Sequence, residues 1–156
     1  MKLTDEVMEK LKIVADRGNA EVQFYLGSIY LNSGRKEEAV KYIILADRNG
    51  WAAASNTIGC MLMEKGDRGL AGKYWRKAAN KDHAGAMFNL GLLHYRNGDS
   101  ARAKEMFEQA AEKGCTEAMH ALSNVYLDEG DTDKAIELWE LAKEYEAKEE
   151  KNDQGQ

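Results

Sequence analysis

At 156 residues the chain suits one compact domain or one short repeat array, and 44% of its residues are hydrophobic. It has no proline, strong helix formers are plentiful, and no long stretch alternates apolar and polar residues. This composition predicts an all-α fold. The formal net charge of −5 argues against a protein that binds duplex nucleic acid, because phosphate contacts need a basic surface.

The residues after Met1 predict neither secretion nor membrane insertion. A charged amphipathic stretch stands where a signal peptide would have its apolar core, and no apolar run approaches membrane-spanning length. The two cysteines, Cys60 and Cys115, make neither a disulfide framework nor a Cys-x-x-Cys site, which favours a reducing compartment. We therefore expect a cytoplasmic protein without a membrane partner.

Residues 4–18 are expected to form a lone helix. Val7, Leu11 and Val14 lie on one helical face, at the same positions as the apolar residues in the second helix of each repeat that follows. A single helix of this kind would act as a capping half-repeat, as the ends of repeat arrays require.

Four repeats of 32 residues follow, at residues 20–51, 52–83, 84–115 and 116–147. Five columns keep their residue type at this period, which is the signature of a helical array. The columns contain Gly27, Gly59, Gly91 and Ser123; Gly34, Gly66, Gly98 and Gly130; Ala39, Ala71, Ala103 and Ala135; Ala46, Ala78, Ala110 and Ala142; and the large residues Ile43, Trp75, Phe107 and Trp139.

The third repeat shows the expected helix–turn–helix most clearly. One helix is predicted over residues 84–95 and a second over residues 100–113. Gly98 suits a left-handed helix end, and Asp99 suits the N-cap of the next helix. Gly91 and Ala103 remove side-chain bulk where the two helices must approach each other closely.

The last helix is predicted over about residues 132–149, and the repeat array over residues 1–150. Residues 151–156 are polar and are expected to be disordered. Because no further helix covers the array here, Leu138, Trp139, Leu141 and Tyr145 form a candidate self-association surface.

The third repeat resembles the tetratricopeptide repeat in its spacing of Leu90-Gly91, Ala103, Phe107 and Ala110. The segments Trp75-Arg-Lys-Ala-Ala79 and Gly85-Ala-Met-Phe-Asn-Leu-Gly91 also resemble Sel1-like repeats. The resemblance covers residues 4–146 and implies a right-handed α-α superhelix. The sequence departs from the family pattern in two ways: its period is shorter, and the proline expected at the end of each repeat is missing. Trp51, His83 and Cys115 occupy the position of that proline. Gly50, Asp82 and Gly114 are therefore expected to end the preceding helices.

The resemblance also implies a function, since the first helices of such repeats line a concave groove that holds a peptide or protein segment. The groove residues expected here are aromatic, aliphatic, amide and a few other polar side chains, which suit a peptide backbone and its side chains. They are Phe24, Ser28, Asn56, Phe88, Asn89, Leu92, Tyr95, Arg96, His120 and Asn124.

One groove column leaves two possibilities open. Leu31, Met63, Tyr95 and Leu127 share a repeat position, and they either face the groove or pack on the next helix. A carboxylate clamp for chaperone tails is not expected, because Asn89 alone matches the residues that such members of the family use.

Enzymatic and metal-dependent functions find no support in the motifs. The three histidines and two cysteines share no metal-ligand spacing, and the sequence contains neither a phosphate-binding loop nor a nucleophile elbow. No catalytic residue, metal or cofactor is therefore expected. The basic cluster at residues 65–81 is interpreted as a solvated helix face rather than a nucleic-acid site. The function predicted is a bacterial, cytoplasmic adaptor that binds a protein segment, and the alternative is a protein that dimerises through its last helix.

Overall fold

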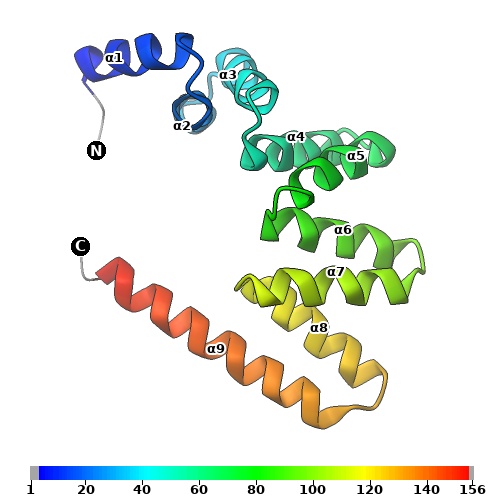
Figure 1. The fold of residues 1–156 in the computed structure, drawn as a ribbon. Coiled ribbons are helices and arrows are strands. Elements are labelled where there is room, and N and C mark those ends of the chain that lie inside the picture. Colours follow the sequence, from blue (N-terminus) through cyan, green and yellow to red (C-terminus); the bar gives the residue numbers. More distant parts are fainter. Residues whose placement is uncertain (1–3, 155–156) are drawn as a thin grey trace. The chain divides into compact units, whose positions relative to one another are not determined.

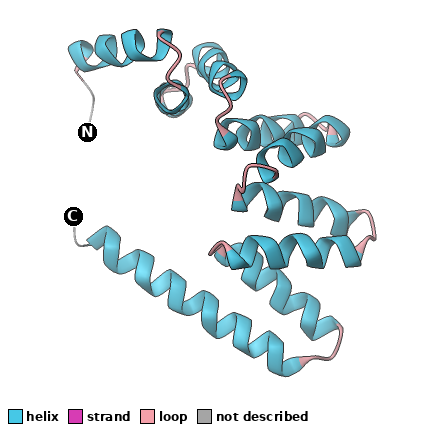
Figure 2. Ribbon diagram, in the orientation of Figure 1, coloured by secondary structure: helices cyan, strands magenta, loops and turns pink. Residues whose placement is uncertain are grey.

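The computed structural model describes residues 4–154 of the chain. These residues form helices joined by short turns, with no strand among them (Figure 2). The chain divides into two compact units, residues 1–81 and 82–156. The all-α architecture expected from composition is thus present throughout the described residues.

The helices follow one another in the pairs that the 32-residue period predicts (Figure 1). In the first unit, α2 packs on α3 and α4 on α5; in the second, α6 packs on α7 and α8 on α9. The first unit contains α1 (Asp5–Asp16), α2 (Ala20–Asn32), α3 (Lys36–Arg48), α4 (Ala52–Glu64) and α5 (Arg68–Ala79). The second contains α6 (Ala84–Arg96), α7 (Ser100–Glu112), α8 (Thr116–Asp128) and α9 (Thr132–Gln154).

Turn geometry explains where the helices end. Gly98 adopts φ +78°, and the carboxylate of Asp99 accepts a hydrogen bond of 3.2 Å from the amide of Arg102, so both expected capping roles are confirmed. Between repeats, Gly50 and Gly114 take φ values of +87° and +82°. Asp82 occupies the equivalent position with φ +62°, the one non-glycine residue with positive φ in the described chain.

Small residues fix how closely each pair of helices packs. A Cβ atom added to Gly91 would lie 2.5 Å from Cε1 of Phe107, and one added to Gly59 would lie 2.5 Å from the Trp75 ring. These separations are about 1 Å below normal contact, which is roughly 3.5–4.0 Å. The glycine column therefore lets a large residue of the second helix pack directly against the backbone of the first.

Buried polar contacts join helices of the first unit. The carboxylate of Asp47 on α3 is 6% exposed and accepts hydrogen bonds from Ser55 Oγ at 2.5 Å and from Lys77 Nζ at 2.7 Å. Gln23 donates to the carbonyl of Ala15, which ties α2 to the end of α1. The capping helix is thus held by hydrogen bonding as well as by apolar packing.

Helix α9 differs from the others in length. It has 23 residues, whereas α2 and α8 have 13 each, and it continues to Gln154 rather than ending near residue 149. The segment 151–154, expected to be disordered, is therefore helical. Residues 155 and 156, the rest of that predicted tail, lie outside the described residues.

Candidate functional site

In the first unit, the predicted groove residues of α2 border an open hollow. Phe24, Tyr25 and Ser28 line it together with Trp51, which precedes α4. Phe24 is half-buried and packs on the core around Ile43, whereas Tyr25 is 49% exposed. The Ser28 hydroxyl donates a 3.0 Å hydrogen bond to the carbonyl of Phe24. Tyr25 is therefore the most accessible aromatic group of this hollow.

The α4 helix contributes less accessible groups. Asn56 is half-buried, as are Thr57 and Cys60 further along the same face. The Thr57 hydroxyl donates to the carbonyl of Ala53 at 2.9 Å. Any partner that follows α4 would therefore meet small, partly covered side chains rather than a large anchor.

In the second unit, the structure separates the predicted groove residues of α6 into two groups. Phe88 packs on Phe107 with ring centroids 5.9 Å apart, and Leu92 packs on the same core cluster. Asn89 is half-buried. Tyr95 is 49% exposed, and Arg96 is also exposed. Phe88 thus has a core role that the sequence pattern alone did not reveal.

On α8, Asn124 is exposed, but His120 is already engaged by the last helix. The His120 ring lies 2.9 Å from a carboxylate oxygen of Glu146 on α9, and Lys143 Nζ lies 2.7 Å from the other oxygen. Hydrogen bonding by Lys143, and secondarily by His120, lowers the pKa of Glu146. The unusual length of α9 supplies this contact, so a groove ligand would have to displace it to reach His120.

The column left open by the sequence is mostly solvent-exposed. Leu31 is 42% exposed, Tyr95 49% and Leu127 51%, whereas Met63 is half-buried. Packing on a neighbouring helix therefore does not account for the three exposed members.

The four residues proposed for self-association do not share one face of α9. Ala135 and Ala142 form its buried face, at 2% and 0% exposure. At 100° per residue, Trp139 lies on one side of that face, and Leu141 and Tyr145 lie on the other. Leu138, which lies on the same side as Leu141 and Tyr145, is half-buried against the core of the second unit.

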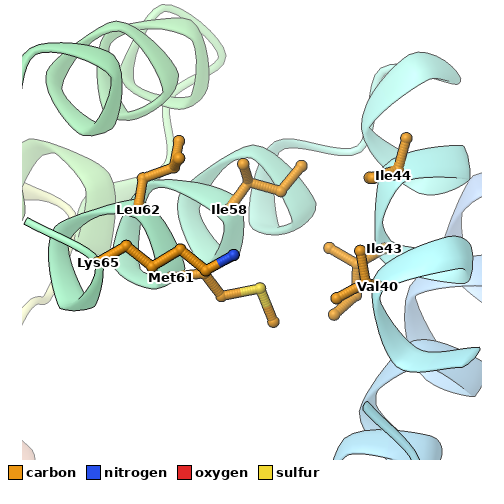
Figure 3. Close-up of a pocket in the computed structure, with 7 residues that line it drawn as sticks. All are labelled: Val40, Ile43, Ile44, Ile58, Met61, Leu62 and Lys65. Carbon is orange, nitrogen blue, oxygen red and sulfur yellow. The ribbon is translucent and has the colours of Figure 1, made fainter. Parts of the chain in front are cut away.

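An apolar hollow between α3 and α4 was missed by the groove-centred prediction (Figure 3). Val40 and Ile44 of α3 face Ile58 and Met61 of α4 across it, and Lys65 lies at its rim (Figure 3). The sequence did contain a signal for this hollow, because α3 has apolar residues where a later repeat has charged ones. Val40 and Ile44 of α3 occupy the repeat positions of Lys104 and Glu108 in α7.

Within the described residues, no group of three or more histidine, cysteine or acidic side chains is placed to hold a metal ion. None of the described helices combines the length and hydropathy needed to span a membrane. What the arrangement offers is a series of exposed aromatic, aliphatic and amide groups on first helices, together with the apolar hollow between α3 and α4 and the exposed apolar side chains of α9.

Such paired helices with recurring small residues at their contacts define an all-α helical-repeat protein of the superhelical class. Residues 57–114 and 88–148 match one tetratricopeptide repeat family model, and residues 20–48 match another. Because these matches span more than half of the chain, it belongs to the tetratricopeptide repeat family. The expected family and fold class are confirmed.

Solved structures extend this likeness to Sel1-type repeats. A Sel1 repeat protein from Oxalobacter formigenes is 28% identical with a TM-score of 0.66, covering 78% of this chain and 99% of its own. A protective antigen of uropathogenic Escherichia coli strains with an SLR fold is 26% identical with a TM-score of 0.77; the match covers 92% of this chain but 33% of the antigen. MamA, at 24% identity and TM-score 0.62 over 97% and 98% of the two chains, shares the fold. A comparison with curated proteins gave no match.

Proposed function

We propose that this protein is an adaptor that holds a segment of another protein along the exposed faces of its first helices. The observation that carries the proposal is that Tyr25, Tyr95 and Leu127 remain 49%, 49% and 51% exposed on helices whose opposite faces are buried. The tetratricopeptide fold supports a general role as an interaction scaffold. The proposed contact residues also include Phe24, Ser28 and Asn56 in the first unit, and Asn89, Arg96 and Asn124 in the second.

The chemistry of the site suits a peptide. Tyrosine offers a large contact area at a small entropic cost, and the amide of Asn124 can both donate to and accept from a peptide backbone. Within each unit the helices that carry these groups pack on buried cores, so their backbone loses little conformational entropy on binding. No catalytic step, metal or cofactor forms part of the proposal, and the proposed setting is the cytoplasm of a bacterium.

Site-specific photo-crosslinking in the native host tests this function. A photoreactive amino acid would replace Tyr25 or Tyr95, and matched controls would carry it at the exposed second-helix positions Leu70 and Glu105. We expect one protein to be cross-linked from the two tyrosine positions and not from the controls. Equal cross-linking from all four positions would contradict the proposal.

A loss-of-binding variant should leave the fold intact. Tyr25→Ala and Tyr95→Ala are suitable because both side chains are half exposed, whereas Phe88→Ala would remove a core contact with Phe107. We expect the double tyrosine variant to lose capture of the cross-linked protein while its circular dichroism and melting temperature stay close to those of the wild type.

A second candidate function, self-association through α9, is favoured by one specific observation. Ile43, Trp75 and Phe107 are 1%, 4% and 2% exposed, but Trp139 in the same column is 51% exposed. An exposed indole at a position that is core in the other repeats is typical of an interface. Sedimentation velocity over a range of concentrations tests it, and a monomer at every concentration would contradict it.

A further inference from the structure

The surface around Trp139 combines an apolar centre with an acidic border, and Lys143 Nζ lies over the Trp139 ring, 5.6 Å from its centroid. Ile136 and Trp139 are each 51% exposed on the same side of α9. Four exposed acidic residues follow alongside at i, i+4, i+7 and i+11, which places them in one row on the helix. They are Asp133, Glu137, Glu140 and Glu144. We call Ile136, Trp139 and these four residues the α9 surface.

The hollow between α3 and α4 has the complementary character. Its cavity volume is about 120 Å³, and apart from Lys65 its lining residues are apolar (Figure 3). Val40 and Ile44 are 41% and 38% exposed, so the apolar surface is accessible. Lys65 places a positive charge at the rim.

The second unit shows which side chain the equivalent place between two helices accepts. There, Tyr126 of α8 stands at the repeat position of Leu62, and its hydroxyl lies 3.3 Å from Glu108 of α7. Its ring lies beneath Lys104 Nζ at 4.1 Å, and Lys104 also pairs with Glu129. In the second unit an aromatic ring and an ion pair therefore fill the place that stays hollow in the first.

Charge is distributed in the same complementary sense. Residues 1–81 contain 14 basic and 10 acidic side chains, a net charge of +4, whereas residues 82–156 contain 8 and 17, a net charge of −9. Surfaces of opposite charge steer encounter and suppress wrong pairings. A second copy of this chain therefore offers an exposed aromatic side chain with carboxylates beside it, whereas the hollow offers an apolar lining with Lys65 at its rim.

We propose that Trp139 of one copy inserts into the α3–α4 hollow of another, with Glu140 near Lys65, so that copies associate head to tail. This proposal rests on self-association as the second function and names its contact. The two surfaces differ, which makes the contact heterologous, and such contacts continue from copy to copy unless a ring closes. Larger oligomers rather than a fixed dimer should therefore form as concentration rises.

A mixing experiment tests the contact directly. Trp139→Ala removes the inserted side chain. Ile44→Glu places a charge in the hollow, and glutamate is the residue that two later repeats have at this position, as Glu108 and Glu140. Each variant alone should associate at least about thirtyfold more weakly than the wild type, as for a central interface residue. Mixed together, the two variants keep one intact surface of each kind and should form a 1:1 dimer and nothing larger.

The outcomes separate this contact from the functions proposed above. A wild type that is monomeric at all concentrations overturns self-association itself. A wild type that associates, combined with variants that fail to complement on mixing, overturns the head-to-tail contact and points to α9 pairing with α9. Capture of a protein from the Tyr25 and Tyr95 positions bears on the adaptor function alone.

A charge exchange provides an independent check. Lys65→Glu and Glu140→Lys should each weaken association, and the double variant should restore it, because the pair is then re-formed with opposite signs. Both side chains are exposed, so neither change should prevent folding. A double variant as weak as either single variant would contradict the assigned pairing.

Discussion

Replacing Gly91 by alanine should destabilise the protein, even though alanine is the better helix former. The helix preference favours alanine by about 1 kcal/mol. Against this, the new Cβ would lie 2.5 Å from Cε1 of Phe107, whose side chain is 2% exposed and cannot move into solvent. Overpacking costs about 1–3 kcal/mol, and a Cβ atom within 3.2 Å of three atoms of one buried ring belongs to the upper part of that range, about 2–3 kcal/mol. We expect a net loss of about 1–2 kcal/mol in the free energy of unfolding.

The matched control is Gly69→Ala on α5. A Cβ atom there would lie 3.8 Å from the nearest heavy atom, an Asp67 oxygen, which is an ordinary contact. With the steric cost absent, alanine should stabilise the protein by about 0.5 kcal/mol. Urea unfolding followed by circular dichroism measures both variants. If Gly91→Ala is neutral or stabilising, the close helix approach does not depend on glycine and the packing argument is wrong.

Three further substitutions and one alkylation experiment test other local features of the structure. Asp82→Gly should raise stability by about 1 kcal/mol in urea unfolding, because φ +62° is strained for aspartate. Asp47→Ala should cost about 2 kcal/mol in the same assay, since a buried acceptor of two hydrogen bonds is lost. His83 caps α6 because its Nδ1 accepts a hydrogen bond from the Ala86 amide, and burial lowers the pKa of this imidazole. Its stabilising effect is therefore complete above pH 6.5 and is lost as pH falls through the pKa of the folded state. His83→Asn should reduce the drop in melting temperature between pH 7.5 and pH 5. Burial raises the pKa of the Cys115 thiol, so alkylation of this thiol should accelerate when the protein unfolds. A Cys60→Ala variant makes Cys115 the one thiol that can react in this assay.

The helix boundaries were predictable because they depend on local rules. A glycine such as Gly98 ends a helix through its own backbone freedom, and Asp99 begins the next through a side chain three residues from its hydrogen-bond partner. The 32-residue period repeats these signals, so even the pairing of helices could be predicted. The end of α9 could not, since residues 149–154 contain no such signal to stop it.

Side-chain exposure was harder to predict than helix position, because it depends on neighbours that the period does not specify. Phe88 has the groove position of its repeat but packs on Phe107, since a phenyl ring is long enough to reach the second helix. His120 has the same repeat position but meets Glu146, which lies beyond the end of an ordinary repeat helix. The hollow beside Val40 arises because the first unit has Val40 and Leu62 where the second has an ion-paired Lys104 and the ring of Tyr126.

The exposure of Trp139 has a physical cause in the first helix of its own repeat. Where the other repeats have glycine, the fourth has Ser123, whose hydroxyl donates a 2.7 Å hydrogen bond to the carbonyl of Ala135. Added Cβ atoms at Gly59 and Gly91 would lie 2.5 Å from the rings that pack there, so a serine leaves no room for an indole in the same place. The two departures from the period are therefore one change: Ser123 closes the site that would bury Trp139, and the indole remains 51% exposed.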